Sequence, residues 1–193
     1  MFNIERVCLE MDGFEVNSYV VHLPEGGDLV VDTGAEPEKI LGCLKNPVAA
    51  ILVTHGHPDH VGVLEELRSE TGAPVYMHPK DTEGAGVMDY EPLEDGQDLE
   101  LAGATIRVLH TPGHSPGSVT FVVGCDQLVG DLILPGSVGR TDLFGGSWEE
   151  IELSIRKVML LWDEHTRLYT GHGPVLSAFE ELETNPYLPL GVL

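Results

Sequence analysis

The chain has 193 residues, of which 42% are hydrophobic, and this size predicts one domain, spanning residues 1–193, with one sizeable core. Its 32 acidic residues against 10 basic ones give a formal net charge of −22, and because nucleic-acid binding needs clustered Lys and Arg, we expect no nucleic-acid partner. The sequence contains no apolar run of about 18 residues and no signal-peptide core, so we expect no membrane partner and a cytoplasmic location. Nothing in the pattern indicates an oligomeric state.

Hydrophobic periodicity and turn residues predict alternating strands and helices in the first half of the chain. The expected elements are strands at 18–23 and 28–32 joined by the turn 24–27, a short helix at 37–44, a buried strand at 49–53 and a helix at 59–71 that Gly72 ends. The strand pair 18–23 and 28–32 is expected to open the fold as a hairpin.

The second half repeats this pattern. Strands are expected at 105–109, 118–123, 127–129 and 167–170, a long helix after the capping pair Ser147 and Glu150, and a last helix after the capping pair Ser177 and Glu180. This order of elements predicts an α/β fold with two sheets packed face to face and helices outside.

The segment 54–60, Thr-His-Gly-His-Pro-Asp-His, carries four potential metal ligands directly after a buried strand. His55 and His57 project to the same side of an extended chain, because side chains two residues apart share a face. Pro58 then turns the chain into a helix whose first turn holds Asp59 and His60. One cation could not use all four ligands from so short a segment, so the spacing favours two neighbouring metals.

Three more ligand-type residues follow apolar strands through a small turn, where loops from several strands converge. These are His114, Asp131 and His172. Beside the segment 54–60, we expect all three to join the metal site. We expect no ligand role for His22, His78, His165 or His110.

The H-x-H-x-D-H segment, followed in order by His114, Asp131 and His172, resembles the metallo-β-lactamase superfamily. The resemblance implies a four-layer αβ/βα sandwich and two divalent metal ions. By this resemblance His55, His57 and His114 hold the first metal, Asp59, His60 and His172 hold the second, and Asp131 bridges them. Asp32-Thr33-Gly34 resembles the turn that supports the metal ligands in this family.

Imidazole and carboxylate ligands suit zinc, our first expectation, and leave iron and manganese open. Two such ions generate hydroxide near neutral pH, and Asp59 is expected to orient it and to carry its proton as the catalytic carboxylate. Gly113-His114-Ser115-Pro116-Gly117 fits the G-x-S-x-G nucleophile pattern, but a strand rather than a helix follows it, so we reject a serine hydrolase.

Residues 139–143 and 184–188 resemble the short bacterial proteins related to glyoxalase II, which implies a small-molecule thioester substrate such as S-lactoylglutathione. Arg140 is a candidate contact for a glutathione carboxylate. The alternatives are a mononuclear iron persulfide dioxygenase that uses His55, His114 and Asp131, a superfamily hydrolase of lactones, β-lactams or phosphodiesters, and a non-catalytic metal-binding scaffold.

Overall fold

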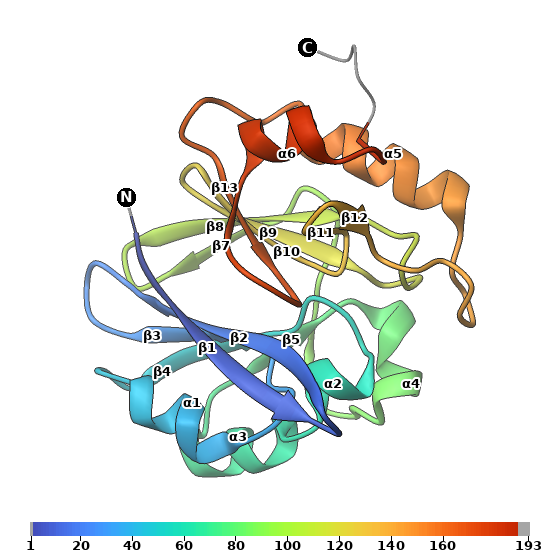
Figure 1. Ribbon diagram of the computed structural model, residues 1–193. Coiled ribbons are helices and arrows are strands. Elements are labelled where there is room, and N and C mark those ends of the chain that lie inside the picture. Colours follow the sequence, from blue (N-terminus) through green and yellow to red (C-terminus); the bar gives the residue numbers. More distant parts are fainter. Residues whose placement is uncertain (1, 189–193) are drawn as a thin grey trace.

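Two six-stranded β-sheets lie face to face in the computed structural model, which describes residues 2–188 (Figure 1). The first sheet has the order β1(Asn3–Met11), β2(Phe14–His22), β3(Asp28–Val31), β4(Val48–Leu52), β5(Val75–Met77), β6(Glu91–Pro92). The second has the order β14(Leu176–Ser177), β13(Arg167–Thr170), β10(Asp126–Gly130), β9(Val119–Val123), β8(Ala104–His110), β7(Asp98–Leu101). A small two-stranded sheet pairs β11(Ile133–Leu134) with β12(Ser137–Val138).

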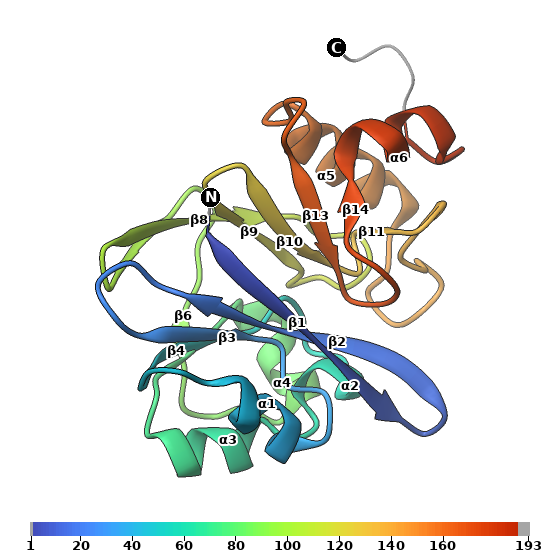
Figure 2. The ribbon, with the colours of Figure 1, turned by 60° about the vertical axis from the view of Figure 1, so that its left-hand side comes forward.

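Helices cover the outer faces of both sheets (Figure 2). Those near the first sheet are α1(Pro37–Cys43), α2(Pro58–Val61), α3(Leu64–Thr71), the 3-10 helix η1(Pro79–Asp81) and α4(Thr82–Ala85). Those near the second sheet are α5(Trp148–Met159) and α6(Ala178–Thr184). None of the helices within residues 2–188 is long and apolar enough to cross a membrane.

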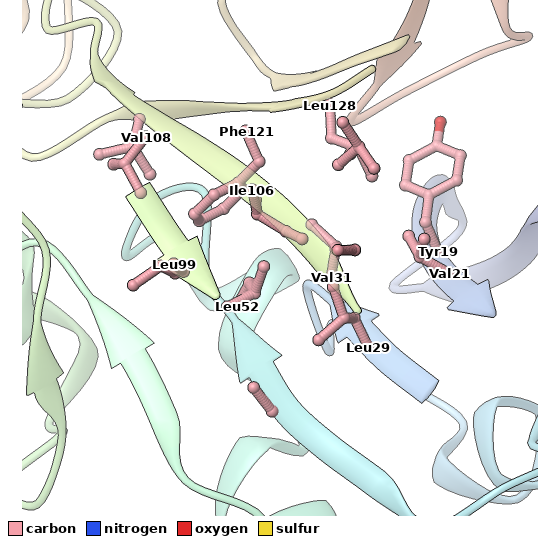
Figure 3. Packing of buried hydrophobic residues seen from close by; sticks show 14 of the residues in the cluster. Tyr19, Val21, Leu29, Val31, Leu52, Leu99, Ile106, Val108, Phe121 and Leu128 are labelled. Atoms are coloured by element: carbon pink, nitrogen blue, oxygen red, sulfur yellow. The ribbon is translucent and has the colours of Figure 1, made fainter. Parts of the chain in front are cut away.

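Three apolar cores separate the four layers, because both faces of each sheet are buried. Between the sheets, side chains such as Val31 and Leu52 meet Ile106 and Phe121, as Figure 3 shows. Side chains on the outer faces point the other way. In the first sheet Val30 and Ile51, next to Val31 and Leu52, pack with Ile40 of α1 and Leu67 of α3. In the second sheet Val129 and Leu168 pack with Ile155 of α5. The expected α/β sandwich of four layers is therefore confirmed.

The expected strands and helices are present with small differences at their ends, except for the helix at 59–71, and both capping pairs form. The Ser147 and Ser177 hydroxyls accept hydrogen bonds from the backbone N–H groups of Glu150 and Glu180. The prediction that strands 18–23 and 28–32 open the fold is wrong, because β1 precedes them and pairs with β2. The sequence signal for the hairpin of β1 and β2 was the dipeptide Asp12-Gly13. Both residues have positive φ, as a tight hairpin turn requires.

The helix expected at 59–71 is broken into α2 and α3. The N–H group of Val63 donates to the carbonyl of Thr33 at 2.9 Å and not to a carbonyl within the helix. Gly62 permits this approach, since a Cβ there would lie 2.3 Å from the carbonyl oxygen of Gly34. The break ties the Asp32-Thr33-Gly34 turn to the ligand-bearing helix α2.

Candidate metal centre

The seven predicted ligands lie at the ends of strands from both sheets. They follow β4 (His55, His57, and Asp59 and His60 on α2), β8 (His114), β10 (Asp131) and β13 (His172). The structure brings all seven together in three overlapping groups whose ligand atoms lie within 4.8 Å of one another. The site thus forms where loops from the two sheets meet.

The first group contains His55, His57 and His114. Nδ1 of His57 and Nε2 of His114 lie 2.8 Å apart. Nε2 of His55 is buried and has no hydrogen-bond partner among the described residues. Metal–nitrogen bonds of 2.0–2.1 Å in a tetrahedral site place two ligand nitrogens about 3.3 Å apart, so these three atoms can converge on one cation after small shifts.

The second group contains Asp59, His60 and His172. Oδ2 of Asp59 lies 3.3 Å from Nε2 of His172 and 3.8 Å from Nε2 of His60. Nε2 of His60 is buried and has no hydrogen-bond partner among residues 2–188. A buried polar atom without a partner is costly, and a metal ion would remove that cost.

Asp131 lies between the two groups. Its Oδ2 is 3.5 Å from Nε2 of His114 and 3.4 Å from Nε2 of His172. Its Oδ1 is 3.5 Å from Nε2 of His60 and is a third buried atom that lacks a partner in the part of the chain described. One carboxylate therefore faces ligands of both groups, which is the arrangement that a bridging ligand needs.

The outer nitrogens of the ligand imidazoles are held by hydrogen bonds that leave the inner nitrogens free. Nδ1 of His60 lies 2.8 Å from Oδ2 of Asp32. Nδ1 of His55 lies 3.1 Å from the hydroxyl of Thr54, which itself donates to Asp32 at 2.7 Å. The expectation that the Asp32 turn lies next to the ligands is confirmed. It orients two of them through one buried carboxylate.

Backbone carbonyls hold two further imidazoles. Nδ1 of His114 lies 2.9 Å from the carbonyl of Arg140, and Nδ1 of His172 lies 2.6 Å from the carbonyl of Glu15. A carbonyl can only accept, so both Nδ1 atoms carry the proton and each Nε2 presents its lone pair when the ring is neutral. The ring orientations suit metal binding.

Burial and neighbouring charges shift the pKa of these groups in the metal-free chain. Burial, aided by nearby His60, lowers the pKa of His55 well below its usual range. Burial also acts to lower the pKa of His60, but the carboxylates of Asp32 and Asp131 raise it to about 9. Hydrogen bonds that His172 donates to the carboxylates of Asp131 and Asp59 raise its pKa to about 11. His55 is thus ready to bind a cation, whereas His60 and His172 must lose protons first.

The carboxylates of the site stay ionised. Burial acts to raise the pKa of Asp131, but the surrounding histidines hold it well below its usual range. Burial likewise opposes ionisation of Asp59, and the hydrogen bond from His172 lowers its pKa. Two ionised carboxylates among histidines form a donor set for divalent cations such as zinc, iron or manganese.

Asp81 organises the site, and the sequence analysis missed it. Its side chain is buried. Oδ2 accepts hydrogen bonds from the N–H of Gly56 at 3.0 Å and from the hydroxyl of Ser115 at 2.5 Å. Oδ1 accepts a hydrogen bond from the N–H of Gly117 at 2.6 Å. Gly56 lies between His55 and His57, and Ser115 follows His114. Asp81 therefore ties together the two loops that carry the first ligand group.

Two glycines allow close approach of the chain to the ligands, and these too were missed. A Cβ at Gly171 would lie 2.0 Å from Oδ1 of Asp131 and 2.7 Å from Cε1 of His60. A Cβ at Gly139 would lie 1.9 Å from the carbonyl oxygen of Asp131. Neither position has room for a side chain while the ligands keep their places.

The rejection of a serine nucleophile agrees with the position of Ser115. Its hydroxyl is buried, donates to Asp81 and lies 2.7 Å from the hydroxyl of Ser118. The strand β9 follows it, as expected from the sequence. Ser115 supports the loop of His114, and Asp81 and Ser118 engage its hydroxyl.

The four histidines not expected to bind metal lie outside the ligand groups found among the described residues. His78 and His110 stack with their ring centroids 4.2 Å apart, and Nε2 of His110 donates to the carbonyl of Pro116. Burial and the neighbouring His110 lower the pKa of His78 to about 4. His22 lies 2.8 Å from the buried carboxylate of Asp28, and His165 is exposed.

A pocket of about 480 Å³ opens over the candidate ligands. Its lining residues are His57, Pro58, Asp59, His114, Asp131, Leu134, Val138, Arg140, Leu143 and His172. Arg140, the candidate contact for a carboxylate, belongs to this wall, but its guanidinium pairs with Asp142 through two hydrogen bonds of 2.8 and 2.9 Å. A small substrate can reach the ligand groups from this side.

Known proteins are similar to this chain in both sequence and fold. The sequence matches the Metallo-beta-lactamase superfamily over residues 11–172. It is 35% identical to the probable metallo-hydrolase YqgX of Bacillus subtilis, over 90% of this chain and 92% of that protein. It is 26% identical to the hydroxyacylglutathione hydrolase GloC of Haemophilus influenzae, over 96% of this chain and 98% of that protein.

Two crystal structures with similar folds are also related in sequence. TTHA1623, solved in a di-iron-bound form, has 37% sequence identity and a TM-score of 0.82, covering 94% of this chain and 99% of that one. The B3 metallo-beta-lactamase BLEG-1 has 30% identity and a TM-score of 0.86, covering 96% and 99%. With the four-layer fold and the grouped ligands, these matches establish that the chain belongs to the Metallo-beta-lactamase superfamily of metal-dependent hydrolases.

Proposed function

We propose that the protein is a dinuclear thioester hydrolase of the glyoxalase II type. The observation that carries the dinuclear part is the position of Asp131, whose two carboxylate oxygens face His60 on one side and His114 and His172 on the other. By this assignment His55, His57 and His114 hold one ion, and Asp59, His60 and His172 hold the other. All seven positions carry ligand-type side chains.

Two divalent ions, when bound, supply hydroxide near neutral pH and polarise a carbonyl oxygen. The protein's own side chains position the reacting groups and accept the proton. Asp59, half-buried and ionised, orients the attacking water through Oδ2 and takes up its proton. Hydrogen bonds to Thr54, Asp32 and the carbonyls of Arg140 and Glu15 hold four of the five histidines in position, namely His55, His60, His114 and His172. A carbon–oxygen bond then forms and the carbon–sulfur bond breaks, giving a carboxylic acid and a thiol.

The chemistry of the leaving group favours a thioester. An amine must be protonated as it leaves, whereas a thiol with a pKa of about 8.5 leaves as the thiolate without a general acid. Among the residues that line the pocket, Asp59 and Asp131 have lowered pKa values and the histidines belong to the ligand groups. The only acid in this wall is thus the Asp59 carboxyl after it has taken the proton of the water, and a thiolate, unlike an amine, can leave without that proton.

The relative GloC supports the same substrate class, since its name describes a hydroxyacylglutathione hydrolase. The alignment covers 98% of GloC, so that protein has about the length of this chain. We therefore propose S-lactoylglutathione or a related thioester as substrate. The di-iron form of TTHA1623 supports iron beside zinc as a candidate metal.

The test measures thiol release from S-lactoylglutathione by the metal-loaded protein, with and without oxygen. We expect equal rates in both conditions, because hydrolysis consumes only water. Asp59→Asn, with its metal content measured in parallel, is expected to lower the rate by about 100-fold or more. Oxygen uptake with glutathione persulfide, together with no thiol release from the thioester, would replace this proposal with a dioxygenase.

A further inference from the structure

A second pocket, of about 550 Å³, adjoins the pocket over the ligands and shares His57, Pro58 and Leu143 with it. Its other lining residues are Gly56, Lys80, Asp81, Glu83, Gly84, Ser115, Pro116 and Phe144. Proline rings and the exposed side chain of Phe144 give it an apolar wall. A substrate whose reacting carbonyl lies over the metal groups can therefore extend one end into this second pocket.

Lys80 differs from every other basic residue of the chain. Each of the other Lys and Arg side chains forms an ion pair with an Asp or Glu, as Arg140 does with Asp142. Lys80 forms no ion pair with any residue within 2–188, although acidic residues outnumber basic ones 32 to 10. In so acidic a chain, a cation left without a partner at the rim of a pocket is available to an anion from outside.

The backbone of Lys80 is fixed relative to the ligand loops. Its N–H donates to Nδ1 of His78 at 3.3 Å, and the next residue, Asp81, binds both Gly56 and Gly117. The lysine side chain thus extends from a rigid base beside the first ligand group. Such fixed positioning lowers the entropy that a contact with substrate would cost.

Lys80 is the one Lys or Arg side chain among the residues that line the second pocket, and neither acidic residue of that lining pairs with it. The Asp81 carboxylate is already engaged by three donors. Glu83 lines the pocket but forms no ion pair with Lys80. Another pocket, beside Asp59 and His172, is lined by Asp12, Glu15 and the apolar residues Met11, Phe14, Val16 and Pro58. Of these two linings, only that of the second pocket contains a Lys or Arg side chain.

From this arrangement we infer that Lys80 is a specificity-determining residue that binds a negatively charged group, such as a carboxylate, at one end of the substrate. This inference rests on the proposed thioester hydrolysis. The substrate is then a thioester with an anionic end that lies along Phe144 and an uncharged end on the side of Phe14. Lys80 acts on substrate affinity and leaves the reacting atoms to the metal ligands.

The test compares matched thioesters that differ in one charge. S-Acetyl-3-mercaptopropionate and its carboxamide place the charge on the thiol end, and mercaptoethanol thioesters of succinate and succinamate place it on the acyl end. The readout is the ratio of kcat/KM for the carboxylate over the carboxamide within each pair. Comparison of the two pairs identifies which end lies beside Lys80.

For at least one pair, we expect Lys80→Gln to lower this ratio by about threefold to tenfold, through KM and not kcat, as removal of one charged contact predicts. Lys80→Arg should keep the ratio of the unchanged protein. Lys39→Gln makes the same change in net charge at a distant helix, where Lys39 pairs with Glu36, and should leave the ratio unchanged. This control separates a local contact from the overall field.

Equal ratios in Lys80→Gln and Lys39→Gln for both pairs, with thioesters still hydrolysed, would overturn the role of Lys80 alone. No thiol release from any of the four thioesters would instead overturn the proposed function, and the role of Lys80 with it. The two failures are therefore distinguishable.

Discussion

Gly171 and Asp131 approach so closely that a Cβ on Gly171 would lie 2.0 Å from Oδ1 of the carboxylate. Real side-chain carbons do not approach an oxygen to this distance, so any residue other than glycine must displace Asp131. The backbone of Gly171 is also anchored, because its N–H donates to the carbonyl of Gly130 at 2.8 Å. The position of the proposed bridging ligand thus depends on a missing side chain 40 residues further along the chain.

Gly171→Ala is expected to lower metal affinity and thioester hydrolysis by about 10- to 100-fold, the usual effect of displacing a metal ligand's support. Elemental analysis measures the loss of bound metal, and thiol release measures the loss of hydrolysis. Gly42→Ala is the matched control, since a Cβ there meets nothing within 4 Å and the residue lies within helix α1. Full metal content and rate in Gly171→Ala would show that Asp131 does not need its present position.

Asp81→Asn is expected to destabilise the protein by about 2–3 kcal/mol, because an amide nitrogen would replace one acceptor and leave a buried donor without a partner. Thermal unfolding of the metal-free protein measures this loss. Metal binding by the first ligand group should weaken as well, since Asp81 ties its two loops together.

Asp89→Asn provides the control for Asp81→Asn. Asp89 is an exposed carboxylate that pairs with Arg68, and an exposed pair contributes about 1 kcal/mol or less. An equal effect of both substitutions on unfolding would show that the buried contacts of Asp81 do not stabilise the ligand loops.

Metal binding should release protons in a pH-dependent manner. In the metal-free chain the pKa of His60 is raised to about 9 and that of His172 to about 11, so at pH 8 both rings hold a proton that ligation must displace. Affinity should therefore rise with pH. His55 and His57, whose pKa values are lowered mainly by burial, are neutral at this pH and release no protons.

Calorimetric titration with zinc in buffers of different ionisation enthalpy counts these protons. We expect about three per chain at pH 8, two from the rings of His60 and His172 and one from the metal-bound water, and fewer as the pH rises through 9, where His60 loses its proton before the metal arrives. Zinc binding without proton release at pH 8 would contradict protonation of the second ligand group.

The sequence was sufficient to predict which seven side chains lie together at the candidate site, but not which residues support them. Four ligands are close together in residues 55–60, and the other three end apolar strands, so local pattern identified them. Asp81 carries no such local signal, because its partners Gly56, Ser115 and Gly117 lie 25, 34 and 36 residues away. Its role exists only once the chain has folded.

The same reason explains the errors in the fold. Helical periodicity predicted one helix at 59–71, but the tertiary hydrogen bond from Val63 to Thr33 breaks it. Alternation and apolar runs identified β2, β3, β4, β8, β9, β10 and β13 but not the other strands. The pairing of β1 with β2 depended on recognising the Asp12-Gly13 turn. The sandwich itself was predictable because the order of apolar strands and amphipathic helices allows few other arrangements.

Stepwise loading of the metal-free protein with zinc, followed in parallel by elemental analysis and by thiol release from S-lactoylglutathione, tests the dinuclear thioester hydrolase most directly. The site predicts that binding saturates at two ions per chain and that most activity appears as the second ion binds, because Asp131 faces both ligand groups. Full activity with one ion per chain, or saturation at one ion, would contradict it.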